Sequence, residues 1–181
     1  MIRSRCFHPD YQLLQIKLGK LHVHTYICIV KLEDAIQSNK FKNPQQKATL
    51  NCLYTAWWLR SVLSKELKTF DLTHEQYNVL RILKGKHPEQ MCVKDIAGRM
   101  MEKSSNVPRI VDRLVAKKWV KRSTSAIDKR ETVITLTQAG INVLETSTNS
   151  IEQLFNRILT LNDSEASQLN DLLEKLRQHE S

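Results

Sequence analysis

The sequence predicts a mainly α-helical protein that carries one small β-hairpin. Three observations support this fold class. Only four Gly and four Pro occur among 181 residues, and proteins built from many short strands need more of these turn residues. From residue 31 onward, apolar residues recur at spacings of three and four, as they do on one face of a helix. Strand-like alternation is clear only in two neighbouring segments, 119–124 and 131–136.

Several start signals place the helices in the first part of the chain. Helices are expected before residue 101 at 32–37, 44–69, 74–84 and 93–100. Pro44 suits the first position of the long helix, because its missing N–H would be unpaired there in any case. Thr73 and Gln76 form a capping box, in which each side chain accepts a hydrogen bond from the other residue's backbone amide.

The second part of the chain combines a basic helix, the hairpin and two terminal helices. The expected order is a helix at 106–117, strands at 119–124 and 131–136, and helices at 138–161 and 162–177. Pro108 has no N–H and is tolerated only in the first turn of a helix. This predicts Ser105 as the N-cap. Thr137 and Asn162 are expected to cap the last two helices.

Positive charge is concentrated in about a quarter of the chain. The net charge is +9, and segment 91–137 alone holds eleven Lys and Arg against five Asp and Glu. Such a concentration suggests a polyanionic partner. The alternative is an ordinary solvated basic surface.

The two short helices at 93–100 and 106–117 are arranged as a helix-turn-helix unit. The second helix of such a unit enters the major groove of DNA with its first residues at the base edges. Those residues are Ser104, Ser105, Asn106 and Arg109. Asn suits adenine and Arg suits guanine, and each bidentate contact contributes about 1–3 kcal/mol of discrimination.

The remaining cations of this segment suit the DNA backbone and the minor groove. Four are placed to contact phosphates, and they supply affinity rather than sequence reading: Arg113, Lys117, Lys118 and Lys121. At the hairpin tip, Arg130, with Lys129 beside it, is placed to enter a minor groove, where narrow A·T tracts concentrate negative potential. Asp128 cannot favour DNA by charge. It is interpreted as an orienting residue that bonds either tip amides or an arginine such as Arg113 or Arg130.

Four segments carry a family resemblance: LTHEQYNVLRIL (72–83), DIAGRM (95–100), NVPRIVDRLVAKKWVKR (106–122) and DKRETVITLTQAG (128–140). Together they resemble the MarR family of winged helix-turn-helix transcription regulators. The tip sequence DKR, followed by a strand that ends in LTxxG, is the most specific piece. The family's recognition-helix arginine falls on Arg109 and its wing arginine on Arg130.

The resemblance implies a winged helix-turn-helix DNA-binding lobe, with long N- and C-terminal helices that form a dimerisation domain. The implied divisions are an uncertain N-terminal extension at 1–29, dimerisation helices at 30–72 and 138–181, and a DNA-binding domain at 73–137. The implied function is a repressor that binds double-stranded DNA at a pseudo-palindromic operator as a homodimer. A DNA-binding protein of low sequence specificity is the architectural alternative.

Two positions depart from the family pattern. Pro108 stands where the family usually has Thr, so one polar DNA contact is missing. Lys118 stands where the family usually has Gly, at the end of the recognition helix. A Lys held in the left-handed conformation there costs up to about 1 kcal/mol, but adds a cation near DNA.

Members of the family are commonly released from DNA by a small aromatic effector. Four aromatic residues are candidates to line such a pocket: Tyr54, Trp57, Trp58 and Tyr77. The alternative is that an aromatic stripe at helical spacing belongs to the core or to a dimer interface. Consecutive tryptophans cannot face one way, so one of the pair is expected to meet a partner chain or a ligand.

The cysteines suggest a second mode of control. None of the four forms a CxxC pair, which predicts a reduced, cytoplasmic protein. One branch of the family senses peroxides through a cysteine in the first long helix, and Cys52 lies in that helix. The sensing position falls nearer Thr49, however, and the neighbours of Cys52 are apolar, whereas a reactive thiolate needs a cationic setting. Cys92 is expected to be a buried strand residue.

Other function classes find no support in the sequence. It has no Gly-rich phosphate loop, no HExxH and no serine elbow, so we expect no enzyme and no cofactor. His22, His24 and Cys28 lack a second ligand pair, so no metal site is expected. No run of about 18 apolar residues predicts a membrane span, and no signal peptide is expected.

Overall fold

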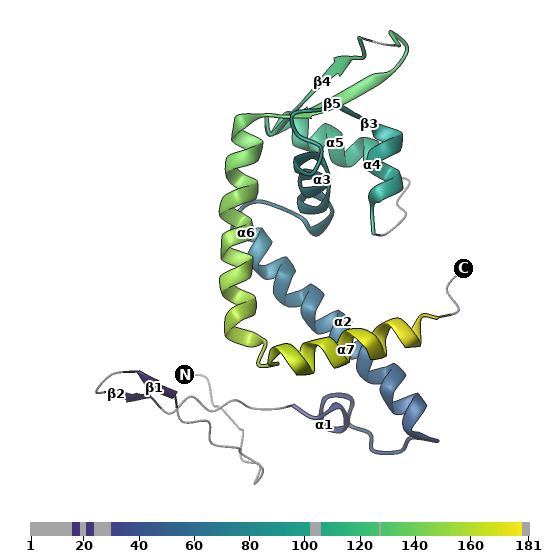
Figure 1. Ribbon diagram of the computed structural model, residues 1–181, viewed down its shortest axis with the longest axis vertical. Coiled ribbons are helices and arrows are strands. Elements are labelled where there is room, and N and C mark those ends of the chain that lie inside the picture. The colour runs from purple at the N-terminus through teal and green to yellow at the C-terminus, as the bar shows by residue number, and fades with distance from the viewer. Residues whose placement is uncertain (1–15, 19–20, 24–29, 102–105, 127, 179–181) are drawn as a thin grey trace. The chain divides into compact units, whose positions relative to one another are not determined.

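The computed structural model describes residues 16–18, 21–23, 30–101, 106–126 and 128–178. The chain forms two compact units that divide between Trp58 and Leu59, and each is considered by itself. Figure 1 shows the ribbon with its elements labelled. Within the described residues the fold is mainly helical and contains the predicted β-hairpin, here extended by a third strand. A second, two-stranded sheet near the N-terminus was not predicted.

The first unit contains a short hairpin, a short helix and most of a long helix. Strands β1 (Ile16–Leu18) and β2 (Leu21–Val23) pair antiparallel. Helix α1 (Leu32–Ile36) is joined to the start of α2 (Pro44–Lys68) by an ion pair between Glu33 and Lys47. The hydrogen bond from the Lys47 ammonium lowers the pKa of the Glu33 carboxyl. Helix α2 begins at Pro44 as predicted and continues into the second unit.

The second unit holds the remaining helices and a three-stranded sheet. Its elements are α3 (His74–Lys84), β3 (Met91–Cys92), α4 (Val93–Arg99), α5 (Val107–Ala116), β4 (Val120–Thr124), β5 (Thr132–Leu136), α6 (Gln138–Ile158) and α7 (Asp163–Leu176). The antiparallel strands lie in the order β3–β5–β4, with Val120 opposite Leu136 and Cys92 opposite Val133. Helices α3, α4 and α5 pack together beside this sheet (Figure 1).

One apolar core holds the second unit together. It joins the inner faces of α3, α5 and α6 to the sheet, and its fully buried members include Leu80, Ile96, Val111, Leu114 and Ile134. The inner face of the basic helix consists of four buried residues: Val107, Ile110, Val111 and Leu114. The opposite face of α5 is thereby fixed toward solvent.

The predicted caps are confirmed in three places. The Thr73 hydroxyl and the Gln76 side chain form both bonds of a capping box at α3. The Thr137 hydroxyl accepts the Gly140 amide at the start of α6. Asn162 and Glu165 form a second capping box at α7.

Some predicted boundaries were wrong. Asn106, not Ser105, is the N-cap of α5, which places Pro108 at the second helical position, where no intrahelical N–H is needed. Helix α6 ends at Ile158 rather than at 161, because the chain turns extended at Leu159 before the next capping box. Cys92 is a strand residue as expected, but it is half-buried rather than buried.

Candidate nucleic-acid interface

Helix α5 presents a cationic outer face. Arg109 and Arg113 are exposed, while the apolar residues between them point into the core. Asn106 is exposed at the N-terminal end of the helix, where it acts as N-cap through its backbone without a capping hydrogen bond from its side chain. Asn106 and Arg109 therefore lie at one end of α5. The other predicted residues of this end, Ser104 and Ser105, lie outside the described residues.

The C-terminal end of α5 closes in a Schellman motif. The Trp119 amide donates to the Leu114 carbonyl at 3.0 Å, and the Lys118 amide donates to the Val115 carbonyl at 2.8 Å. Such a motif requires a left-handed residue after the helix, and Lys118 has φ 60°. The family usually has glycine at this position, and the expectation that Lys118 adopts a left-handed backbone here is confirmed. Its side chain is exposed, as is that of Lys121 on β4.

Lys117 differs from its neighbours. Its side chain retains only 24% exposure, and its ammonium lies 3.0 Å from the Asp71 carboxylate. The same ammonium donates to the Asp71 carbonyl and to the Gln76 side chain. Lys117 therefore faces protein groups that the sequence pattern did not connect with it, because Asp71 lies 46 residues earlier.

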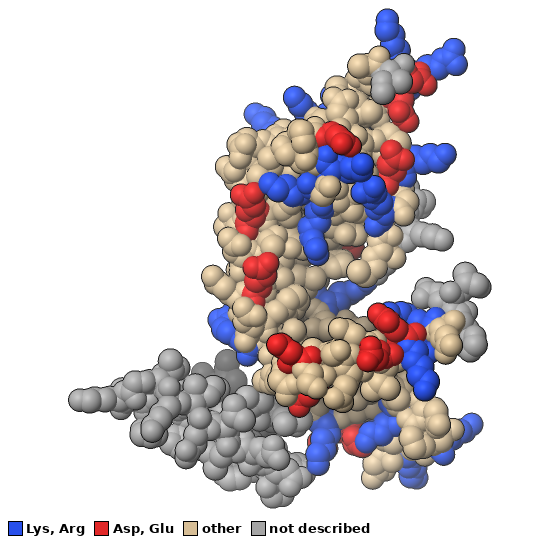
Figure 2. Space-filling model, in the orientation of Figure 1, with Lys and Arg blue, Asp and Glu red and all other residues tan. Residues whose placement is uncertain are grey.

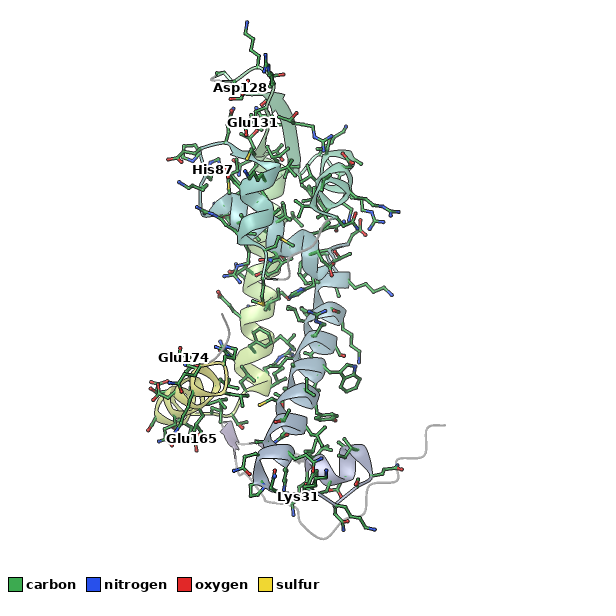
Figure 3. The ribbon with its side chains drawn as sticks, turned by 90° about the vertical axis from the view of Figure 1, so that its right-hand side faces the viewer. Lys31, His87, Asp128, Glu131, Glu165 and Glu174 are labelled. Carbon is green, nitrogen blue, oxygen red and sulfur yellow. The ribbon has the colours of Figure 1, made fainter. Side chains whose placement is uncertain are left out.

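The wing is the β4–β5 hairpin with its charged tip. Asp128 accepts a hydrogen bond from the Arg130 amide at 2.9 Å, and its own amide donates to the Ser125 hydroxyl at 3.3 Å. The Glu131 amide donates to the Asp128 carbonyl at 2.9 Å. Asp128 thus bonds a tip amide, the first of its two expected modes. Figure 3 shows Asp128 and Glu131 together at the tip, and the side chains of Lys129 and Arg130 are exposed.

An ion pair joins the wing to the recognition helix. Arg122 on β4 lies 2.7 Å from the carboxylate of Asp112 on α5. Both side chains are substantially exposed, so the pair adds little free energy. It nevertheless connects two separate elements of the interface. Sequence reasoning missed it, because no periodicity relates a helix residue to a strand residue ten positions later.

A cleft of about 760 Å³ adjoins the C-terminal half of α5. It is lined by the end of α2, the start of α3 and the end of α5, including Arg60, Lys68, His74, Arg113 and Lys117. Glu75 also lines it, and the pKa of its carboxyl is lowered by hydrogen bonds from its own backbone amide and from Thr73. Lys and Arg outnumber Asp and Glu in the lining, which includes none of the four aromatic residues predicted for a ligand pocket.

Those four aromatic residues lie in two environments. Tyr77 is buried, and its hydroxyl lies 3.0 Å from the Thr148 hydroxyl of α6. Tyr54 and Trp57 form a tilted ring pair with centroids 5.6 Å apart. Trp57 is 61% exposed, whereas Trp58 is half-buried. This difference in exposure agrees with the expectation that the two tryptophans face different ways.

Two of the four cysteines, Cys52 and Cys92, lie among the described residues. Burial raises the pKa of the Cys92 thiol, which accepts a hydrogen bond from the Asp95 amide. Cys52 is half-buried within α2. Among the described residues, no three His, Cys, Asp or Glu side chains are grouped to hold a metal ion; His24 and Cys28 lie outside that part of the chain. None of the described helices is long and apolar enough to cross a membrane.

Comparison with known proteins agrees with this geometry. The MarR family profile matches residues 72–132. The uncharacterized HTH-type transcriptional regulator YpoP of Bacillus subtilis (strain 168) is 30% identical over 119 residues, which span 65% of this chain and 79% of YpoP. The chain belongs to the MarR family. As a member, it is a DNA-binding transcriptional regulator.

Solved structures of the family share its fold. A putative MarR-like regulator from Bacillus cereus ATCC 10987 has a TM-score of 0.66 at 20% identity, covering 75% of this chain and 96% of its own. A mutant of E. coli MarR, complexed with operator DNA, has a TM-score of 0.65 at 24% identity, covering 76% and 99%. The predicted winged helix-turn-helix fold is therefore confirmed.

Proposed function

We propose that this MarR-family protein is a repressor, that it binds a pseudo-palindromic operator as a homodimer, and that a small-molecule effector releases it. The observation that carries this proposal is the set of exposed cations on one helix and one hairpin: Arg109, Arg113, Lys118, Lys121, Lys129 and Arg130. Figure 2 shows Lys and Arg side chains over the winged-helix part and at its hairpin tip. Polyanion binding needs such a cationic surface.

The residues of this surface divide into three roles. The base readers are Asn106 and Arg109, together with Ser104 and Ser105, which precede them in the sequence. Arg113, Lys118 and Lys121 contact phosphates and set the register of the helix. Arg130, held by the tip hydrogen bonds of Asp128, enters the minor groove with Lys129 beside it. Lys117 was predicted as a fourth phosphate contact, but its contacts with Asp71 and Gln76 favour a different role.

The homodimer is supported by apolar side chains that each unit leaves exposed. In the second unit, exposed leucines follow α6 and line one face of α7: Leu159, Leu161, Leu169, Leu172 and Leu176. In the first unit, Leu53 and Trp57 are exposed on α2. Exposed apolar stripes on terminal helices are typical of an oligomer interface. We therefore assign dimerisation to 30–72 and 138–181, and DNA binding to 73–137.

The effector is proposed to be a small aromatic molecule. The proposal rests on the exposed ring of Trp57 and its neighbour Tyr54, with Trp58 as a further candidate for the lining. The effector then releases DNA because it binds the conformation of the free protein more tightly than the DNA-bound conformation. A regulator that binds chromosomal DNA acts in the compartment that contains the chromosome, which in a bacterium is the cytoplasm.

The division of roles on DNA is testable with two variants. Arg109→Ala should relax sequence preference and cost about 1–3 kcal/mol on the selected site. Lys121→Ala should weaken all DNA about equally and reduce the salt slope by about 1. Site selection from random DNA, followed by titration on the selected and a scrambled duplex at several salt concentrations, measures both effects. Equal, modest losses on both duplexes for both variants would contradict the division.

A further inference from the structure

Lys117 lies at the junction of three helix ends. It is the C-cap of α5, and its ammonium contacts Asp71, which follows α2, and Gln76, which belongs to the first turn of α3. The ammonium also lies 4.6 Å from the ring centroid of Trp119. An ammonium has three N–H donors, and three oxygens surround this one: the Asp71 carbonyl, the Asp71 carboxylate and the Gln76 side-chain carbonyl.

The contacts are anchored on the protein side. Gln76 is buried to 3% exposure, and its side-chain oxygen also accepts the Thr73 amide in the capping box of α3. The Trp119 carbonyl accepts both the amide and the hydroxyl of Thr137 at the start of α6. Gln76 therefore offers Lys117 a buried acceptor that the capping box of α3 holds in place, whereas the Asp71 side chain is exposed.

Both helix ends that Lys117 connects have an unusual backbone. Asp71 has φ 54°, and the Leu72 amide donates to the Leu67 carbonyl at 3.0 Å, the Schellman bond that closes α2. Lys118 has φ 60° at the corresponding position after α5. Neither residue is glycine, so both ends carry some strain. The left-handed turn at Asp71 leaves its carbonyl available to Lys117.

The orientation of α5 matters because its other end reads bases. A helix of ten residues is about 15 Å long, so a tilt of about 4° at one end moves the other by about 1 Å. Specific contacts require positions within about 0.5 Å. A group that fixes the C-terminal end of α5 against α2 and α3 therefore controls the placement of Asn106 and Arg109.

We propose that Lys117 is a positioning residue: its bonds to Asp71 and Gln76 lock the recognition helix to the α2–α3 turn in the orientation that reads the operator. The lock rests on the proposed operator recognition. It assigns Lys117 an internal role in place of the phosphate contact expected from sequence. The Asp71 carboxylate is 87% exposed, so its share of the lock is smaller than that of the carbonyl and of buried Gln76.

Two variants separate positioning from phosphate contact. Lys117→Met keeps the length of the side chain and removes its donors; it should weaken operator binding about ten-fold and change binding to scrambled DNA much less. Its salt slope on the operator should match that of the unmodified protein, whereas Lys121→Ala lowers the slope by about 1. A loss that is equal on both duplexes and comes with a slope reduction of about 1 would overturn the lock.

The second variant is Asp71→Asn, for which the two explanations predict opposite signs. Asn tolerates the left-handed backbone, so the turn is preserved. Charge alone predicts tighter DNA binding when an acid is removed, whereas the lock predicts operator binding about two- to three-fold weaker. Glu89→Gln is the matched control, because it removes an exposed acid that pairs with Lys86, three residues earlier. Tighter operator binding by Asp71→Asn would overturn the lock.

Failure of the lock is distinguishable from failure of the proposed function. If the unmodified protein selects an operator and both variants retain its full preference, the lock alone is wrong. If the unmodified protein selects no site, operator recognition is wrong, and a double-mutant cycle of Lys117→Met and Asp71→Asn in urea unfolding decides whether the residues are coupled. Additive effects in that cycle overturn the lock, and coupled effects support it.

Discussion

At the residue scale, Gly140 shows how the wing is held to the helix that follows it. A Cβ at this position would lie 2.0 Å from the Trp119 carbonyl oxygen. That oxygen already accepts the Thr137 amide at 3.0 Å and the Thr137 hydroxyl at 2.9 Å. It cannot withdraw without breaking both bonds, so the close approach of two backbones requires glycine here.

Gly140→Ala is therefore expected to lower the free energy of unfolding by about 3 kcal/mol, since the added methyl group must displace backbone. Gly98→Ala is the matched control, because nothing lies within 4 Å of a Cβ built there. That change should raise stability by up to about 1 kcal/mol, as Ala favours a helix more than Gly. Urea unfolding measures both. Similar effects of the two substitutions would contradict the steric explanation.

For individual site residues, some structural features could be predicted from the sequence and others could not. The left-handed backbone of Lys118 was predictable, because the family places glycine there and the end of a helix has a local pattern. The internal contacts of Lys117 were not, because they depend on how the end of α2 meets the end of α5. A charge pattern identifies exposed cations, but it cannot tell which of them folds back onto the protein.

At the scale of the element, local signals placed every long helix. Capping boxes at Thr73 and Asn162 and the proline at position 44 mark helix starts through bonds within a few residues, so no tertiary information is needed. Strand β3 is different: with two residues it has no periodicity, and it exists because Met91 and Cys92 pair with β5. The ends of α5 and α6 were misplaced by one to three residues, because helix ends fray and apolar periodicity does not mark the last residue.

The wing tip is an element whose shape depends on one side chain. Asp128 Oδ1 accepts the Arg130 amide at 2.9 Å and thereby orders the turn that carries Arg130. Asp128→Ala removes this acceptor, so operator affinity should fall about two- to five-fold even though a negative charge near DNA is lost. Asp128→Asn keeps the acceptor and should bind at least as tightly as the unmodified protein. DNA titration of both variants tests this, and tighter binding by Asp128→Ala would show that charge, not order, dominates.

At the scale of the whole molecule, the sequence and the structure raise the same question about partners. A single chain leaves Leu169, Leu172 and Leu176 exposed at 43%, 65% and 56% on one face of α7. Leucines at such spacing are typical of a buried helix face, yet the described residues of one chain do not cover them. Apolar residues at spacings of three and four predicted the helix, but no pattern within one chain identifies what covers its leucines.

Leu172→Glu tests whether a second copy covers this stripe. In a symmetric dimer the substitution places a carboxylate in the interface twice, and burial of an unpaired charge should weaken self-association at least about 100-fold. Ser167→Glu adds the same charge to the opposite face of α7 and should leave the dimer intact. Sedimentation at micromolar concentration measures both masses. The dimer proposal predicts that the unmodified protein and the Ser167→Glu variant are dimers and that the Leu172→Glu variant is a monomer. It is contradicted if the unmodified protein is a monomer, or if Leu172→Glu is as dimeric as Ser167→Glu.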